Sequence, residues 1–155
     1  MAGSVFGNRV LRKEDPKFLT TGGVYVDDLK DAALDGALHV TYVRSTVAHG
    51  RILSIDTSDA ASMPGVVAIY TAADLELQPM PSAFNPAVTR GLLAIEKVRF
   101  VGEPVAVVLS EERAQGEDAA EQVIIDYDVL PPVVDMEGAL TNSSLIHEEI
   151  GRAHV

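Results

Sequence analysis

One short stretch of the chain constrains its fold more than any other: five apolar residues, Val105 to Leu109, stand between Pro104 and Ser110. An unbroken apolar run of this length is typical of a strand buried within a sheet. A domain that contains such a strand needs a hydrophobic core around it. With 155 residues, the chain is long enough to form one domain of this kind.

The rest of the sequence predicts a mixture of short strands and short helices. Leu38, Val40 and Tyr42 alternate with polar residues, which predicts a strand with these three side chains on its buried face. Further strands are expected at about 51–57, 66–70, 98–100 and 123–129, and helices at about 58–63, 72–75, 111–122 and 136–140. Residues 77–91 show no periodicity and predict a long loop. The order of elements indicates an α+β (mixed α/β) domain with about six strands.

The longest predicted helix carries its own signals. We expect Ser110 to cap it, with acidic residues at the next two positions, where carboxylates interact favourably with the helix dipole. Small side chains then recur at steps of three and four residues, which predicts that the helix lies close against a sheet. They are Gly116, Ala119, Ala120 and Val123.

Residues 1 to about 36 are expected to form an extended N-terminal arm. Basic residues at positions 9, 12 and 13 give it a local positive charge. Asp15-Pro16 and Gly22-Gly23 are expected to interrupt regular structure. A segment of this type is usually laid over a neighbouring domain or protein.

Composition and charge exclude several classes of function. The formal net charge of −11 argues against nucleic acid as a partner, because a phosphate backbone must be met by clustered Lys and Arg. The sequence contains no apolar run long enough to span a membrane, and its first six residues lack the features of a secretory signal, so a cytoplasmic location is expected. The absence of cysteine excludes disulfides, thiolate metal sites and cysteine nucleophiles.

Two sequence motifs could in principle carry catalysis or bind a phosphate. Ser45 follows Arg44 and precedes His49 by four residues, but the G-x-S-x-G turn of many hydrolases is missing. A strand end followed by a turn is the simpler interpretation. Gly22-Gly23 follows no predicted strand and opens no helix, so it predicts a tight turn in the arm and not a phosphate-binding loop.

Carboxylates and histidines offer few further candidates. Asp126 and Asp128 alternate along one predicted strand, so both should point to the same, solvent-facing side. Glu103 lies in apolar surroundings, and its burial would raise its pKa or require a partner such as Arg99. The histidines stand singly, with His39 expected on the polar face of its strand, and so predict no metal site. They are His39, His49, His147 and His154. The sequence thus predicts no catalytic, cofactor-binding or metal-binding residue.

A series of short phrases, in order and at fixed spacing, resembles a known family. The series includes Gly7-Asn8-Arg9-Val10, Phe18-Leu19-Thr20, Tyr25-Val26-Asp27-Asp28, Ala48-His49-Gly50-Arg51-Ile52, Pro64-Gly65-Val66-Val67-Ala68, Val98-Arg99-Phe100-Val101-Gly102-Glu103-Pro104 and Asp126-Tyr127-Asp128-Val129-Leu130-Pro131. Together they resemble the α/β-hammerhead domain and preceding arm of the large subunit in the xanthine dehydrogenase, aldehyde oxidase and carbon monoxide dehydrogenase family. The resemblance extends over residues 7 to 148 and is greatest to the carbon monoxide dehydrogenase-like branch.

The resemblance implies a parent enzyme with a division of labour. Such large subunits bind molybdenum on a pyranopterin, often as a cytosine dinucleotide, and pass electrons to iron–sulfur and flavin subunits or domains. In the family, the pterin-binding loops and the catalytic glutamate lie in domains that follow the hammerhead. No position in this sequence matches those motifs, so no catalytic residue is carried over. Gly22-Gly23 also departs from the Gly-Arg-Gly-like turn of many relatives.

The domain assignment that follows is an arm at 1–36, a hammerhead domain at 37–148 and a tail at 149–155. The tail resembles the translation of a sequencing-library adapter, so we expect it to be non-native. We therefore expect a large subunit truncated before its catalytic domains, inactive by itself and completed by those missing domains. A free-standing interaction or assembly module is the alternative, and a hydrolase using Ser45 or Glu103 is a third possibility. Neither the substrate, the electron acceptor nor the oligomeric state follows from the sequence.

Overall fold

The apolar run forms the central strand of the fold. In the computed structural model, which describes residues 7, 12–23, 25–76, 78–86, 88–141 and 143–148, β7 (Pro104–Ser110) lies between two antiparallel neighbours. These are β1 (His39–Arg44) and β3 (Val66–Thr71). The prediction of a strand buried within a sheet is confirmed, since Val105 and Val108 are fully buried.

A second sheet places β2 (Gly50–Asp56) between two short partners. These are β6 (Lys97–Val98) and β8 (Ile124–Val129), both antiparallel to β2. The strand expected at 98–100 is therefore shorter than predicted, because a turn begins at Phe100 and leads into β7. The expected loop at 77–91 contains one further antiparallel pair, β4 (Met80–Pro81) and β5 (Thr89–Arg90).

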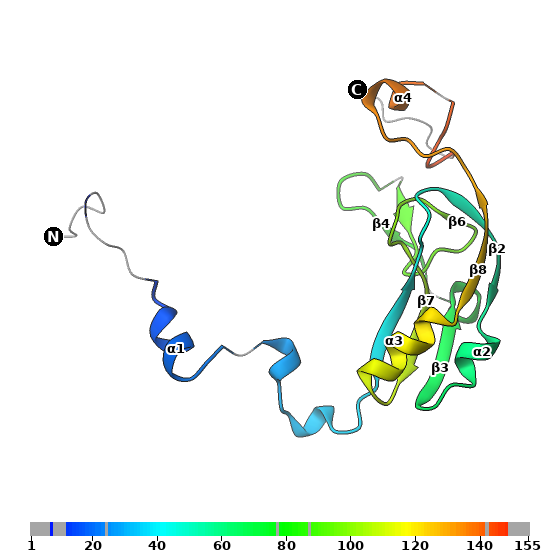
Figure 1. The fold of residues 1–155 in the computed structure, drawn as a ribbon. Coiled ribbons are helices and arrows are strands. Elements are labelled where there is room, and N and C mark those ends of the chain that lie inside the picture. Colours follow the sequence, from blue (N-terminus) through cyan, green and yellow to red (C-terminus); the bar gives the residue numbers. More distant parts are fainter. Residues whose placement is uncertain are drawn as a thin grey trace. The chain divides into compact units, whose positions relative to one another are not determined.

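The helices of this region are short. They are α2 (Ser58–Ala61), the 3-10 turn η3 (Ala72–Asp74), α3 (Arg113–Glu121) and α4 (Met136–Ala139). Figure 1 shows α3 lying along the sheet of β1, β7 and β3. The prediction of an α+β domain is confirmed by this arrangement.

The small side chains of α3 let the helix approach the sheet closely. Gly116 and Ala119 are buried against it, as the stripe predicted. A Cβ atom at Gly116 would lie 2.6 Å from both the Ser110 hydroxyl and the Thr41 hydroxyl. The core beneath the helix consists of Val43, Ala60, Ala106, Val108 and Ala119.

A second core lies between the two sheets and the loop before β6. Ala94, Val98 and Val105 form its centre, and Ile125 of β8 packs against both cores. The two cores therefore share a residue. Because β7 contributes Val105 to one and Val108 to the other, its alternating side chains face two different sets of neighbours.

The buried face of β1 is the opposite of the one predicted. The apolar residues Leu38, Val40 and Tyr42 remain exposed, whereas Thr41 and Val43 face the core. The alternation correctly predicted a strand, but α3 covers the face that carries Thr41. Two small helix residues and a threonine fit there, and a row of large side chains would not.

One predicted break in regular structure and one predicted helix cap also require correction. Asp15-Pro16 begins the helix α1 (Asp15–Thr20), because a proline in the first turn lacks only an N–H that the helix does not use. Ser110 belongs to β7, where it pairs with both neighbouring strands. The cap of α3 is instead Glu112, whose N–H donates to the Gln115 side chain at 3.0 Å.

The chain divides into two compact units, Met1–Asp35 and Gly36–Val155. The first contains α1 and two 3-10 turns, η1 (Val26–Asp28) and η2 (Ala32–Leu34). Arg9, His154 and the tail at 149–155 lie outside the described residues. Across the described part of the chain, every helix is too short and too polar to cross a lipid bilayer.

Candidate functional site

Four polar side chains are buried where the two sheets meet: Ser45, His49, Lys97 and Glu103. We call them the polar cluster. Ser45 follows β1, His49 precedes β2, Lys97 lies on β6 and Glu103 precedes β7. Since buried polar groups are costly unless they are hydrogen-bonded, the partners of each side chain indicate what it can do.

Ser45 and His49 are bonded to the backbone rather than to each other. The Ser45 hydroxyl donates to the Val47 carbonyl at 2.7 Å and accepts from the Val47 N–H at 3.1 Å. His49 Nδ1 lies 2.9 Å from the Pro131 carbonyl, which can only accept, so Nδ1 carries the proton. His49 Nε2 is buried and makes no hydrogen bond with the described residues. The serine is thus held in a local turn, and the described geometry does not support the nucleophile–base pair considered from the sequence.

Glu103 secures the turn that leads into β7. Its carboxylate accepts a hydrogen bond from the backbone N–H of Arg99, so the partner is the main chain of the expected residue and not its guanidinium. Gly102 takes a positive φ of 88°, which favours glycine. Its carbonyl accepts from the Arg44 guanidinium at 2.9 Å. The buried carboxylate is therefore explained by the geometry of this turn.

The turn is also tied to the end of β1 by its backbone. The Ser45 N–H donates to the Glu103 carbonyl at 2.9 Å, and the Gly102 N–H donates to the Ser45 carbonyl at 2.8 Å.

The hydroxyl of Tyr127 lies near this turn. Burial raises its pKa above the usual 10.0. The charge of Glu103 adds to the rise, and the Ser45 hydroxyl opposes it. A raised pKa keeps Tyr127 neutral, which does not suit a general base at neutral pH.

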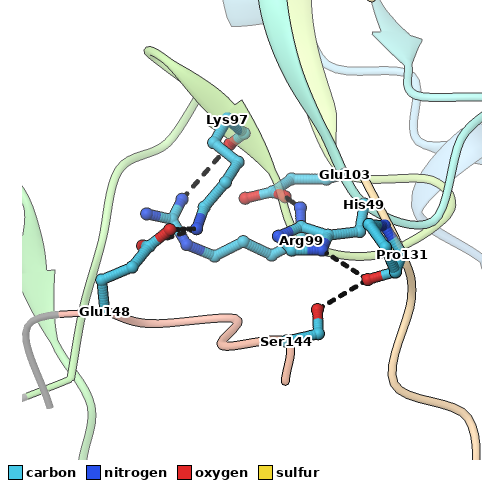
Figure 2. A network of polar contacts seen from close by, with 7 residues as sticks. All are labelled: His49, Lys97, Arg99, Glu103, Pro131, Ser144 and Glu148. Atoms are coloured by element: carbon cyan, nitrogen blue, oxygen red, sulfur yellow. Dashed lines mark hydrogen bonds and ion pairs between the residues drawn. The ribbon is translucent and has the colours of Figure 1, made fainter. Parts of the chain in front are cut away.

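Lys97 is neutralised from a distant part of the sequence. Figure 2 shows its ammonium at the carboxylate of Glu148, at distances of 2.6 and 2.7 Å. Only 8% of the Lys97 side chain is exposed, against 59% for Glu148. Hydrogen bonding to Lys97 is the main cause that holds the pKa of Glu148 below its ordinary value, and the charge of Arg99 contributes. Ser144 donates to the Pro131 carbonyl at 2.7 Å, so this bond and the Lys97–Glu148 pair both fasten residues 143–148 to the domain.

A cavity of about 760 Å³ opens beside this network. Its walls come from the 79–91 loop, the segment before β6, the turn before β7 and residues 146–147. Apolar side chains such as Phe84 and Phe100 line it together with Arg99 and Glu103. The cavity could accept an apolar segment, and its lining also includes His147.

The remaining candidates stay apart from the cluster. Asp126 and Asp128 both project to solvent from β8, as predicted, and Asp128 pairs with Arg51 at 3.0 Å. His39 is exposed on β1. Within the described residues, no three His, Cys, Asp or Glu side chains are grouped so that they could hold a metal ion. No step of a redox reaction is therefore assigned to these side chains.

Sequence reasoning missed the ion pair of Lys97 with Glu148. Lys97 was not singled out because a lysine beside Val98 gives no sign that it will be buried. Glu148 stands in a stretch without periodicity, 51 residues away. A pairing between such distant residues leaves no local pattern to read.

Comparisons with known proteins agree with the fold. The family model for the aldehyde oxidase and xanthine dehydrogenase a/b hammerhead domain matches residues 20–131. The large subunit of nicotine 6-hydroxylase from Paenarthrobacter nicotinovorans is 40% identical over 94% of this chain and 18% of its own length. The carbon monoxide dehydrogenase large chain of Afipia carboxidovorans is 43% identical over 90% of this chain and 17% of its own.

Solved structures give the same result. A Cu,Mo-CO dehydrogenase in its carbon monoxide reduced state superposes with a TM-score of 0.79 at 41% identity, over 96% of this chain and 18% of that one. Quinoline 2-oxidoreductase from Pseudomonas putida 86 gives a TM-score of 0.72 at 36% identity, over 94% of this chain and 19% of that one. The chain therefore spans less than a fifth of these relatives. It belongs to the aldehyde oxidase and xanthine dehydrogenase a/b hammerhead domain family.

Proposed function

We propose that this chain acts as the hammerhead domain of the large subunit of a molybdenum-dependent oxidoreductase, and that its role there is structural. The observation that carries the proposal is the family match across residues 20–131. Because the chain spans less than a fifth of the large subunits it resembles, we assign the oxidation itself to the remaining part of such a subunit.

The bonding of the polar cluster supports a structural role. Ser45, His49 and Glu103 each hold a backbone group in place. A nucleophile or base that is already bonded to the main chain must break that bond before it can act. These side chains instead fix the path of the chain from β1 into β2 and from β6 into β7, which a scaffold requires.

The cofactor and partners of the proposed parent follow from the family. Molybdenum-pterin, in the cytosine dinucleotide form, would be held by the other domains of the subunit and would supply two-electron chemistry there. Iron–sulfur and flavin subunits or domains would accept the electrons. The 155 residues of this chain include no cysteine with which to bind an iron–sulfur cluster. We place the assembly in the cytoplasm.

The arm and the domain have different proposed roles. Residues 1–36 would lie over a neighbour in the assembled enzyme, and residues 37–148 would form the hammerhead scaffold. The positively charged and apolar side chains of the first unit, such as Lys17 and Phe18, are exposed and available for such a contact. Residues 149–155 are proposed to be foreign to the natural protein.

The test begins with the source gene. It would be sequenced past the codon for Leu145, and the complete subunit would be produced with the products of neighbouring genes. Molybdenum content would be measured by mass spectrometry, and dye-coupled oxidation would be assayed with carbon monoxide, an aldehyde and a nitrogen heterocycle. The 155-residue chain would be measured beside it. We expect stoichiometric molybdenum and turnover in the complete enzyme, and neither in the chain alone.

Three results would contradict the proposal. Stoichiometric molybdenum-pterin in the 155-residue chain, or turnover by it, would show that the chain builds an active centre. A natural stop codon directly after the hammerhead would instead favour the free-standing interaction module. Loss of a measured hydrolysis in both Ser45→Ala and Glu103→Gln variants would revive the hydrolase hypothesis.

A further inference from the structure

The sheet of β1, β7 and β3 has a second apolar face on the side away from α3. Alternation along each strand places six side chains there, and the register brings them together. They are Val40 and Tyr42 of β1, Val107 and Leu109 of β7, and Ala68 and Tyr70 of β3. We call these six residues the open face. None of the six carries a charge, and the two tyrosine hydroxyls are their polar groups. The Arg44 guanidinium lies 5.5 Å from the centre of the Tyr42 ring.

Within the second unit, the described residues leave the open face partly exposed. Val40 is 54% exposed, Tyr42 is 36% and Tyr70 is 37%, whereas Val107 between the two rings is 8% exposed. An antiparallel sheet that meets water on one side normally carries polar residues there. A sheet that is apolar on both faces is instead the middle layer of a three-layer arrangement. The helix α3 supplies one of the two outer layers.

The chain itself already covers one end of the same face. Val105 lies two residues before Val107 on β7 and therefore points the same way. It is fully buried, in contact with Ala94 and Val98 of the loop and strand before it. Coverage thus begins at Val105 and is incomplete at the other end of the strand. The layer that covers the rest of the face would continue this existing core.

We infer that the open face is covered by an apolar layer from the rest of the same large-subunit polypeptide. This inference rests on the proposed function. More than four fifths of the length of the relatives lies outside the part that this chain matches, which is ample polypeptide to supply a layer. A face whose own six side chains are uncharged favours a permanent contact, because interfaces that form and separate carry more polar groups.

The chemistry argues against a second copy as the occupant. Each copy carries a formal net charge of −11, so pairing two of them brings like charges together. A domain in the same polypeptide is held nearby by the chain and needs no such association between separate molecules. The covalently joined layer is therefore favoured over a homodimer.

A single introduced cysteine tests the inference cleanly, because the chain contains none. Val40→Cys would be placed in the 155-residue chain and in the complete subunit, and the rate of maleimide labelling would be followed on the peptide that contains it. Asp118→Cys, on the exposed side of α3, is the matched control. Circular dichroism would establish that each variant is folded, and Tyr70→Cys provides a second position on the face.

We expect position 40 to label about tenfold more slowly in the complete subunit than in the chain alone, since a buried interface excludes the reagent, with a smaller change at position 118. Equal rates in the two proteins, or equal slowing at both positions, would overturn the inference. Protection in the chain alone that increases with its concentration would identify a second copy instead. If the complete enzyme is active but position 40 still labels freely, the inference fails and the proposed function stands. If the gene encodes no further domains, both fail.

Discussion

The two faces of the β1–β7–β3 sheet have similar side chains but different surroundings. On one, Val108 is fully buried beneath α3; on the other, Val40 is 54% exposed. The difference does not come from hydrophobicity, since both are valines on neighbouring strands. Val108 lies on the central strand beneath α3, whereas Val40 lies on the edge strand β1, on the face that α3 does not cover. The helix α3 thus covers one side of the sheet, and the other side is the open face, for which we infer a docking surface.

The largest expected effect on stability comes from placing a charge on the face of the sheet that α3 covers. Val108→Asp buries an unpaired carboxylate beneath α3 and should reduce the free energy of unfolding by about 4 kcal/mol or more. Val40→Asp, the matched change on the open face, should cost about 1 kcal/mol or less, because its carboxylate stays in water. Urea unfolding of the 155-residue chain would measure both.

If Val108→Asp abolishes folding altogether, the same experiment records the loss of the cooperative transition. Val108→Ala then gives a measurable change: its free energy of unfolding should fall by about 2 kcal/mol because of the cavity that the substitution leaves. Equal destabilisation by Val40→Asp and Val108→Asp would break the comparison, since it would make the open face part of the core of the isolated chain.

The next largest effect tests how tightly α3 covers its face. Gly116→Ala places a Cβ atom 2.6 Å from the Thr41 and Ser110 hydroxyls. The crowding should outweigh the gain in helix propensity, for a net loss of about 1 to 2 kcal/mol. Thermal unfolding would measure it. Asp118→Ala, on the exposed side of the same helix, should be neutral or slightly stabilising, and a stabilised Gly116→Ala protein would show that the helix does not press on the sheet.

A smaller effect concerns the covered end of the open face, where β6 is fastened by Lys97 and Glu148. The pKa of Glu148 is lowered in the folded protein. The stability that its carboxylate contributes is therefore present when the pH is above the ordinary pKa of 4.5, and it is lost as the pH falls below that value. Because Glu148 is 59% exposed, solvent screens the pair, and Glu148→Gln should cost about 1 kcal/mol or less at pH 7.

The pH dependence separates this pair from a general effect of charge. The difference in unfolding free energy between wild type and Glu148→Gln should disappear as the pH falls from 5 to about 3. Glu76→Gln, which removes another exposed glutamate, is the control and should show no comparable difference. A difference for Glu148→Gln that persists at low pH would mean that the carboxylate does not act through its charge.

The smallest expected change in stability comes from a lysine on the open face. Val40→Lys should alter the free energy of unfolding by about 0.5 kcal/mol or less, while it lowers the binding of an apolar dye to the isolated chain. Val129→Lys removes a valine of similar exposure, 65%, from the other sheet and should lower the dye signal less. Equal loss from both variants would show that the open face is not a distinct apolar surface.

Several features of the fold could be predicted because they depend on neighbours in the sequence. The run at Val105–Leu109 predicted the central strand, and the spacing of Gly116 and Ala119 predicted the close approach of α3. The alternation of Asp126 and Asp128 correctly placed both at the surface. In each case the pattern repeats within a single element, so the element's own geometry was enough.

The candidate site was less predictable. The sequence singles out Ser45 and Glu103 as candidates. Their hydrogen bonds to the backbone of Val47 and Arg99 depend on turns whose conformation the sequence does not predict. The ion pair of Lys97 with Glu148 joins residues that share no local pattern. At Ser110, local sequence preference competes with strand pairing. Its position in the sequence favours a helix cap, but pairing with two strands keeps it in the sheet.

By itself, the sequence determined that β1 is a strand with two unlike faces and that β7 is apolar on both. It did not determine which face of β1 lies inward, because a period of two distinguishes the faces without orienting them. The tertiary structure decided this by the fit of α3, whose small residues pack over Thr41 and Val43. The larger side chains of Val40 and Tyr42 were thereby left on the side of the sheet away from α3.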